Sequence, residues 1–383
     1  MDTYLRYKSI SIFSHVAELT SPLVRLSSAK TDEERVSLAA EIFGLVAKSG
    51  ADSTGEWIKS LLLSDDNVFS RTAATGERIS DRVKTQVKNE LLYFKQLSLI
   101  SPDAFVTDEV KDFFPRFGSG GLSVTYDGLV LYYSVNGFGR FSSSAAFVYR
   151  DGALTAVKPD GTRLSDLKNY AEEKNEIVKN TENFIAGLPA FHTLLYGDRG
   201  TGKSTTVRAL ANEYRGKIKM IELAHSEIKH LSELRAEIAA LKQKFIIFID
   251  DLAFDESDKA AEELKTALEG SLDSFTGNCL LYCTSNRRHL FKEDEKPQRR
   301  NDDVQAELAL FDRFGLVITY INPDKEEFVD ILKQILRSRG VKWRDEYAPL
   351  AELAALKKGG RSPRAAKQIA DLIESTYAQR LVE

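Results

Sequence analysis

One stretch of nine residues carries the clearest chemical signal in the chain. It fits the pattern G-x-x-x-x-G-K-[ST] without a mismatch. It reads Gly197-Asp198-Arg199-Gly200-Thr201-Gly202-Lys203-Ser204-Thr205. Glycines let the backbone curl so that several N–H groups point at one anion. In such a phosphate-binding loop (P-loop), Lys203 faces the β- and γ-phosphates and the Ser204 hydroxyl ligates Mg²⁺. The stretch therefore predicts a site for a nucleoside triphosphate.

Two adjacent aspartates, Asp250 and Asp251, follow the apolar run 245–249. A strand that delivers a carboxylate beside a P-loop holds Mg²⁺ and its water, so we assign Asp250 to the metal. Asp251 then lies where a carboxylate can polarise the attacking water. The alternative is an aspartate pair that simply starts a loop. The position of Asp250, 47 residues after Lys203, favours the functional interpretation.

A polar amide, Asn286, follows the apolar run 279–284. At the carboxyl end of a strand in an open α/β sheet, such a side chain points into the ligand crevice. There it orients a water or touches the γ-phosphate. An asparagine that caps the following helix explains the residue nearly as well.

Two arginines complete the set of candidate phosphate-facing residues. Arg313 lies between Phe311 and Phe314, which suits a guanidinium held on a rigid base and reaching a neighbouring subunit's γ-phosphate. A surface salt bridge is the alternative. Arg364 falls in the first turn of a helix begun by Ser362-Pro363 and suits a sensor of the phosphates. An arginine that solvates the helix start is the alternative, and Arg361 competes for the sensor role.

These residues need a sheet that brings strand ends together. Strands are expected at the short apolar runs 192–196, 218–223, 245–249, 279–284 and 316–321. Helical patterns separate the runs, so we predict an α/β fold with a parallel five-stranded sheet and helices on both faces. We assign 162–322 to this nucleotide-binding core and 323–383, which is helical throughout, to a lid.

The upstream part of the chain lacks such chemistry. Residues 1–105 are expected to form a helical domain, with helix-period stretches at 34–47 and 82–97. We assign 106–161 to a β-rich meander attached to the core. Strands are expected at β-rich runs such as 129–135 and 146–150. The turns between them are predicted at three dipeptides that favour tight hairpins, Asp127-Gly128, Asn136-Gly137 and Asp151-Gly152.

Composition limits the classes of partner that the chain is expected to bind. A net charge of −4 with 29% charged residues does not support coating nucleic acid by charge alone. The two cysteines, Cys279 and Cys283, share one apolar run and predict buried thiols. The sequence shows no signal peptide and no apolar stretch long enough to span a membrane. We therefore expect a cytoplasmic protein that has no membrane partner. Basic side chains at 287–300 alternate with acidic ones, which favours a solvated loop over a nucleic-acid patch. They are Arg287, Arg288, Lys292, Lys296, Arg299 and Arg300.

The ordered set of P-loop, Asp-Asp strand end, Asn286, Arg313, Arg364 and helical lid resembles an AAA+ ATPase over residues 162 to 380. Several segments are more narrowly similar to DUF815, an uncharacterised bacterial family of AAA+ ATPases. They are Leu194–Ser204, Lys244–Leu252, Leu268–Leu272, Thr284–Leu290 and Asp312–Leu316, with Phe138–Phe147 and Val157–Asn180 upstream.

The resemblance implies ATP and Mg²⁺ as ligands, held by Lys203, Ser204 and Asp250. It implies Asn286 as first sensor, Arg313 as arginine finger and Arg364 as second sensor, with Leu167 and Tyr170 at the adenine pocket. One departure matters, since most AAA+ proteins carry Asp-Glu where this chain has Asp-Asp. The shorter Asp251 loses about 1.5 Å of reach, and such displacements can cost on the order of a hundredfold in rate. Slow hydrolysis, or action through an additional water, is therefore expected.

Three functions fit these observations. The first is Mg²⁺-dependent ATP hydrolysis in a homo-oligomer, a ring or open spiral built through Arg313, that remodels an unknown protein or nucleic-acid client. The second is a slow-hydrolysing, ATP-dependent assembly switch or loader. Asp251, the lack of an evident aromatic pore loop and the loader-like segment Asp312–Gly315 favour it. The third is a structural adaptor whose nucleotide only stabilises the fold.

Overall fold

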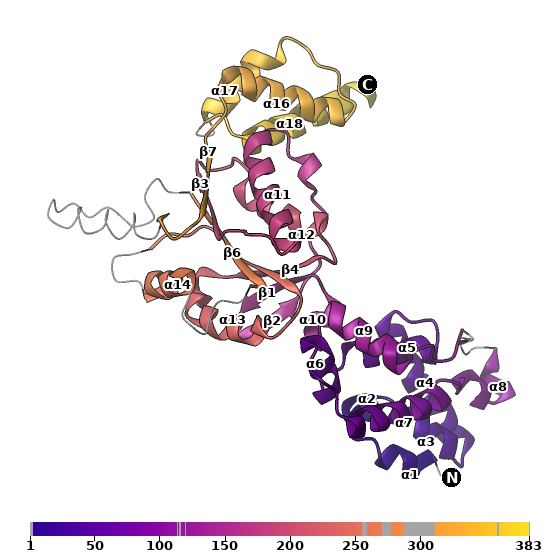
Figure 1. Cartoon of the computed structure of the whole chain (residues 1–383). Helices are drawn as coiled ribbons and strands as arrows, with labels where there is room; N and C mark the ends of the chain where they lie inside the picture. Colours follow the sequence, from indigo (N-terminus) through magenta and orange to yellow (C-terminus); the bar gives the residue numbers. More distant parts are fainter. Residues whose placement is uncertain are drawn as a thin grey trace. The chain divides into compact units, whose positions relative to one another are not determined.

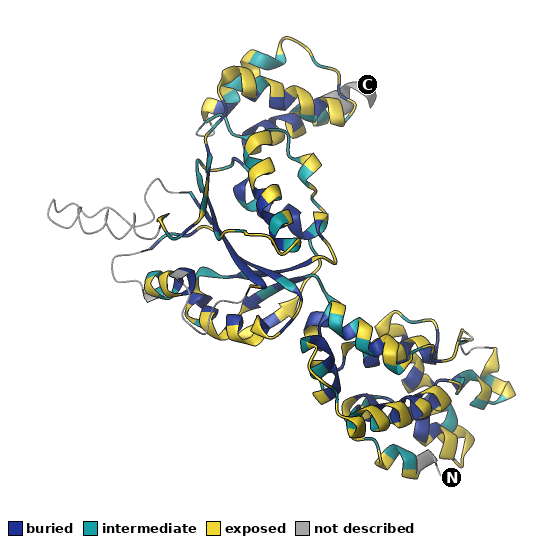
Figure 2. Cartoon of the chain, viewed as in Figure 1, coloured by how far each residue is buried: buried dark blue, intermediate teal, exposed yellow. Residues whose placement is uncertain are grey.

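The computed structural model of the chain describes residues 3–112, 114, 116–118, 120–254, 259–269, 277–286, 311–357 and 360–382. It divides into two compact units, residues 1–144 with 241–243, and residues 145–240 with 244–383 (Figure 1). Each unit has its own buried core (Figure 2). In the described parts of the chain, no helix is both long and apolar enough to cross a membrane.

The described residues of the first unit form helices joined by loops, and the helices predicted at 34–47 and 82–97 are confirmed as α4 and α7. Its elements are α1 (Thr3–Lys8), α2 (Ser14–Leu19), α3 (Ser21–Ser28), α4 (Asp32–Ser49), α5 (Thr54–Ser64), α6 (Val68–Thr75), α7 (Asp81–Leu97), the 3₁₀ helix η1 (Pro102–Phe105), α8 (Asp108–Lys111), α9 (Tyr126–Asn136) and α10 (Arg140–Ser143).

The strand predicted at 129–135 is wrong, because these residues lie in helix α9. Thr125 caps this helix by accepting a hydrogen bond from Gly128 N–H. Leu129 and Tyr133, four residues apart, are both fully buried on one helix face. Gly137 then ends the helix with a φ of 81°, and its N–H donates to the Tyr133 carbonyl. The Asp-Gly and Asn-Gly dipeptides here mark the two ends of a helix instead of hairpin turns.

The second unit contains a seven-stranded sheet of order β2-β1-β4-β5-β6-β3-β7. The five predicted strands are all confirmed, and they are parallel to one another. The strands are β1 (Ala146–Arg150), β2 (Ala153–Ala156), β3 (Thr193–Gly197), β4 (Ile218–Leu223), β5 (Lys244–Ile249), β6 (Cys279–Ser285) and β7 (Leu316–Tyr320). Both cysteines are buried and free, as expected.

The two additional strands form a hairpin, which is the part of the predicted meander that is confirmed among the described residues. Asp151 and Gly152, with φ values of 53° and 71°, make its turn. Strand β1 also pairs in parallel with β4, so the hairpin extends the large sheet by two strands. The N-terminal stretch of the first unit ends at Ser144, inside the segment 106–161 that the sequence assigned as a whole to the meander.

Helices cover both faces of the sheet (Figure 1). Helices α11 and α12 lie on one side, where Ile177, Val207 and Leu210 share a buried cluster with strand residues, and α13 and α14 lie on the other. The core helices are η2 (Leu164–Asp166), α11 (Ala171–Ile185), α12 (Lys203–Glu213), η3 (His225–His230), α13 (Leu231–Ala239) and α14 (Lys259–Glu269).

Three C-terminal helices, here called the lid helices, pack on one another. They are α16 (Lys325–Ser338), α17 (Tyr347–Lys357) and α18 (Pro363–Val382). Phe328 and Leu332 of α16 are fully buried with Ala366 and Ala370 of α18. Asp324 and Glu327 form a capping box that fixes the start of α16.

His192 holds the start of β3 against β6, because its Nδ1 accepts the Leu281 N–H at 3.0 Å. Burial, with the positive charge of Arg235, lowers the pKa of His192 from 6.5 to about 4. The unfolded chain therefore takes up this proton at a higher pH than the fold does. Lowering the pH from about 6.5 to 4 should reduce the free energy of unfolding by up to about 1.4 kcal/mol per pH unit.

Urea denaturation at about pH 7 and pH 5 checks this prediction. The loss of stability between the two values should be smaller in His192→Gln, whose amide oxygen can still accept the N–H but does not titrate. An equal loss in both proteins would contradict it.

Candidate nucleotide-binding site

The P-loop connects β3 to α12, and its shape depends on three glycines with left-handed backbone conformations. Gly197, Gly200 and Gly202 have φ values of 127°, 76° and 102°. A Cβ atom at Gly197 would lie 2.0 Å from the Tyr320 carbonyl oxygen, so β7 leaves room only for glycine. The Asp198 N–H donates to the same carbonyl at 2.9 Å. The loop is therefore fixed against the neighbouring strand.

Lys203 is folded over this loop and is only 4% exposed. Its Nζ donates to the carbonyls of Gly197 and Asp198 at 3.0 and 2.7 Å, and to Asn286 Oδ1 at 2.9 Å. Burial lowers the pKa of Lys203 to about 8, against the attraction of Asp198 and other nearby carboxylates. The ammonium group is thus placed where the sequence predicts the phosphates.

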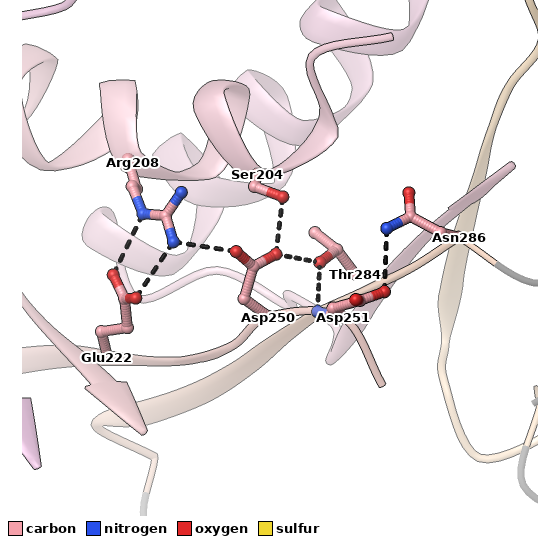
Figure 3. Close-up of polar contacts among 7 residues, drawn as sticks. All are labelled: Ser204, Arg208, Glu222, Asp250, Asp251, Thr284 and Asn286. Atoms are coloured by element: carbon pink, nitrogen blue, oxygen red, sulfur yellow. Dashed lines mark hydrogen bonds and ion pairs between the residues drawn. The ribbon is translucent and has the colours of Figure 1, made fainter. Parts of the chain in front are cut away.

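Asp250 lies at the end of β5 and is the centre of a polar network (Figure 3). Its Oδ1 accepts hydrogen bonds from the Ser204 hydroxyl at 2.5 Å and the Thr284 hydroxyl at 2.6 Å. Its Oδ2 accepts from Arg208 Nη2 at 2.8 Å. Burial alone would raise the pKa of Asp250, but these three donors outweigh it and hold the pKa below its usual value. Asp250 is therefore a carboxylate poised beside Ser204.

Arg208 and Glu222 are polar residues of this network that sequence reasoning missed. Arg208 Nε and Nη2 each donate to Glu222 at 3.0 Å, so that the guanidinium bridges Glu222 and Asp250. One signal could have found the arginine, because it stands four residues after Ser204 and so shares its helix face. Nothing in the sequence pattern singles out Glu222 on β4.

Asp251 and Asn286 are brought together with Lys203. Asp251 has a φ of 54°, an uncommon conformation that aspartate tolerates better than most residues. Its N–H donates to the Thr284 hydroxyl at 3.0 Å, and its Oδ1 accepts from Asn286 Nδ2 at 2.8 Å (Figure 3). Since the oxygen of the same amide accepts from Lys203, Asn286 bridges the ammonium and the carboxylate. Whether it also caps a helix concerns residues 287–310, which lie outside the described residues.

A cavity of about 570 Å³ lies between the P-loop, the segment before α11 and the lid helices. Among its lining residues are Leu167, Tyr170, Gly200, Thr201, Gly202, Thr205, Ile335 and Arg364. Tyr170 is held in place, since its hydroxyl donates to the Ile321 carbonyl at 2.7 Å and its ring lies 4.9 Å from that of Tyr320. The predicted adenine-pocket residue thus lines a cavity beside the P-loop.

The two candidate sensor arginines have different surroundings. Arg361 is engaged by both carboxylate oxygens of Glu352. Arg364 lines the cavity, and its backbone N–H donates to the Gly200 carbonyl at 3.1 Å. Of the two, the structure places Arg364 next to the P-loop. The P-loop side chain of Arg199 is exposed.

Arg313 stands apart from this group, before the amino end of β7. Leu316, three residues later, pairs with Thr193 at the amino end of β3, whereas the P-loop follows the carboxyl end of β3. Its flanking aromatic residues are anchored, since Phe314 is 4% exposed and the ring of Phe311 lies 5.7 Å from that of Tyr196. The mixed-charge loop predicted at 287–300 lies outside the described residues.

The oxygen donors beside the P-loop fit Mg²⁺. A serine hydroxyl and a carboxylate are hard ligands, and Mg²⁺ is commonly held by one or two such groups together with phosphate oxygens and water. In the described ranges, no cluster of three or more His, Cys, Asp and Glu side chains could hold a metal ion. Ser204 and Asp250 would hold the ion together with a bound phosphate.

The model of the family described as "Protein of unknown function (DUF815)" matches residues 142–377, which is more than half of the chain. The chain belongs to this family. The five parallel core strands in the order β7-β3-β6-β5-β4, with the P-loop after β3 and helices on both faces, give this DUF815 protein an α/β P-loop fold.

Other similar proteins match shorter parts of the DUF815 chain. Replication factor C subunit 3 of Saccharomyces cerevisiae is 29% identical over 30% of this chain and 36% of its own length. An AAA-ATPase of Arabidopsis thaliana is 29% identical over 57% of this chain and 50% of its own. The RuvB Holliday junction branch migration motor of Thermotoga maritima shares 19% identity over 56% of this chain and 64% of its own, with a TM-score of 0.41. The matched part of the chain spans only 16 to 36% of the length of the first curated relatives.

Proposed function

We propose that this DUF815 protein binds ATP with Mg²⁺ and hydrolyses it to ADP and phosphate. The observation that carries the proposal is the convergence of Lys203, Asp250, Asp251 and Asn286 at one edge of the sheet, beside the P-loop and its cavity. The carboxyl ends of parallel strands β5 and β6 supply three of these residues, which is where ligands bind in open α/β sheets.

Each residue has a role that its position supports. Lys203 and the P-loop amides bind the phosphates, and Ser204 with Asp250 holds Mg²⁺, which neutralises phosphate charge when bound. Asp251 accepts a proton from the attacking water, and Asn286 orients that water. Arg364 reaches the phosphates from the lid, and Tyr170 contacts the adenine.

We further propose a homo-oligomer in which Arg313 serves a neighbouring subunit. Arg313 precedes the amino end of β7, at the strand ends opposite to those that carry its own P-loop. Such a placement supports action on the next subunit's γ-phosphate, where a planar guanidinium stabilises the transferring group. Turnover in this assembly would remodel a protein or nucleic-acid client.

A second candidate is an ATP-dependent assembly switch or loader that hydrolyses slowly. The short Asp251 side chain, which is bound by Asn286, favours it. Light scattering and phosphate release distinguish the two functions. ATP-driven assembly with negligible turnover would support the switch, and rapid turnover without any partner would exclude it.

Replacing Lys203 tests the nucleotide site directly. Lys203→Met removes charge-assisted hydrogen bonds to the phosphates, so we expect the affinity for a fluorescent ATP analogue to fall about tenfold to a hundredfold. Lys217→Met, at an exposed lysine beyond the end of α12, is the matched control and should bind like wild type. Undiminished binding by Lys203→Met would refute the assignment of this site.

A further inference from the structure

The guanidinium of Arg208 lies between two carboxylates, and it is held more firmly by one than by the other (Figure 3). Glu222 accepts two hydrogen bonds from it, through both carboxylate oxygens at 3.0 Å. Asp250 accepts one, at 2.8 Å, through Oδ2. The guanidinium also lies 5.3 Å from the ring centre of Phe248, two residues before Asp250 on β5. Glu222 is thus the main partner of Arg208.

This arrangement divides the two oxygens of Asp250 between different tasks. Oδ2 is bound by Arg208, and Oδ1 is aimed at the hydroxyls of Ser204 and Thr284. A single bond to Arg208 fixes the rotation of the carboxylate while leaving Oδ1 on the Ser204 side. Glu222 holds the Nε–Nη2 edge of the guanidinium in a bidentate pair, so that edge is not available to Asp250, which accepts a single hydrogen bond from Nη2.

We propose that Arg208 is a positioning residue for Asp250 and that Glu222 restrains Arg208, so that this ion-pair chain sets the Mg²⁺ requirement of the nucleotide site. The inference rests on the proposed function, since it concerns the metal bound with the nucleotide. Neither residue needs to touch nucleotide or metal.

Removing the charge of Glu222 should therefore weaken metal binding in two ways. The released guanidinium can form a bidentate pair with Asp250 and occupy the oxygen that faces Ser204. The net charge beside the metal also becomes one unit more positive, which repels a cation. Together we expect Glu222→Gln to raise the half-saturating Mg²⁺ concentration about fivefold to tenfold.

A double-mutant cycle separates this mechanism from a general disturbance. The four proteins are wild type, Glu222→Gln, Arg208→Met and the double variant. Binding of N-methylanthraniloyl-ADP is titrated with Mg²⁺, and Mn²⁺ binding is read directly from the electron paramagnetic resonance signal of the free ion. Glu222→Gln should raise the metal requirement more when Arg208 is present than when it is absent, with affinity for the nucleotide in EDTA nearly unchanged.

The matched control is Glu352→Gln, which weakens a similar pair, in which Arg361 Nε and Nη2 both donate to Glu352, and should leave the Mg²⁺ titration unchanged. Thermal unfolding checks that the variants are folded. If Glu222→Gln is unstable, Glu222→Asp replaces it, with an expected rise of about twofold.

Two outcomes would overturn the inference. One is an unchanged Mg²⁺ requirement in folded Glu222→Gln, and the other is an equal rise in the presence and absence of Arg208. Failure of the wild-type protein to bind the nucleotide at any Mg²⁺ concentration would instead refute the proposed function.

Discussion

Replacing Asp251 with asparagine should lower ATP turnover about a hundredfold or more while leaving ATP affinity nearly unchanged. The amide has the size of the carboxylate but cannot accept a proton from water, and general-base catalysis typically contributes 10²- to 10⁴-fold, as an order of magnitude. Asp251 contacts the amide of Asn286, whereas the proposed phosphate contacts come from Lys203 and the P-loop amides. Phosphate release measures turnover, and a fluorescent ATP analogue measures affinity.

The matched control for this variant is Asp108→Asn, at an aspartate of the first unit whose side chain is 97% exposed. It should keep wild-type turnover. If Asp251→Asn also keeps wild-type turnover, Asp251 is not the base. The same variant serves to find the client, because a partner captured by Asp251→Asn in ATP and absent from Lys203→Met depends on bound nucleotide.

Replacing Arg313 with alanine should abolish the rise of specific activity with protein concentration that an arginine finger acting in trans produces. An arginine finger contributes about 10³- to 10⁵-fold to turnover in other nucleotide hydrolases. Arg82→Ala, at an exposed arginine of the first unit, is the matched control and should leave the rise intact. Wild-type activity strictly proportional to concentration would contradict a finger that acts in trans.

Mixing two inactive variants makes this test sharper. Arg313→Ala keeps an intact P-loop site, and Asp251→Asn keeps an intact arginine. In a shared oligomer, a subunit of the first kind can receive the arginine of the second, so the mixture should regain turnover. A mixture of two assembled variants that stays inactive would place Arg313 outside the neighbour's site.

The five core strands could be predicted because each is a short apolar run, and central strands such as β5 and β6 are buried on both faces. The meeting of Asp250 with Ser204 and of Asn286 with Lys203 followed from the same pattern. Parallel strands place their carboxyl ends at one edge, so polar residues that follow such runs are brought together.

Other features depended on contacts that no local pattern contains. Strand propensity and turn dipeptides pointed to a hairpin around 129–135, but a cap at Thr125 and the burial of Leu129 with Tyr133 produce a helix. The pairing of β1 with β4 joins segments some seventy residues apart, such as Ala146 and Met220. Arg208 and Glu222 likewise meet across a helix and a strand, and their spacing in sequence has no helical or strand period.

The hydrogen bond from the Arg364 N–H to the Gly200 carbonyl connects the first turn of α18 to the backbone of the P-loop. A displacement of this end of the lid must break the bond or move the loop with it. If a partner binds better to the displaced lid, it weakens nucleotide binding. By thermodynamic linkage, the nucleotide weakens the binding of that partner by the same free energy. We therefore expect the affinity for nucleotide to report on whatever presses against the lid helices.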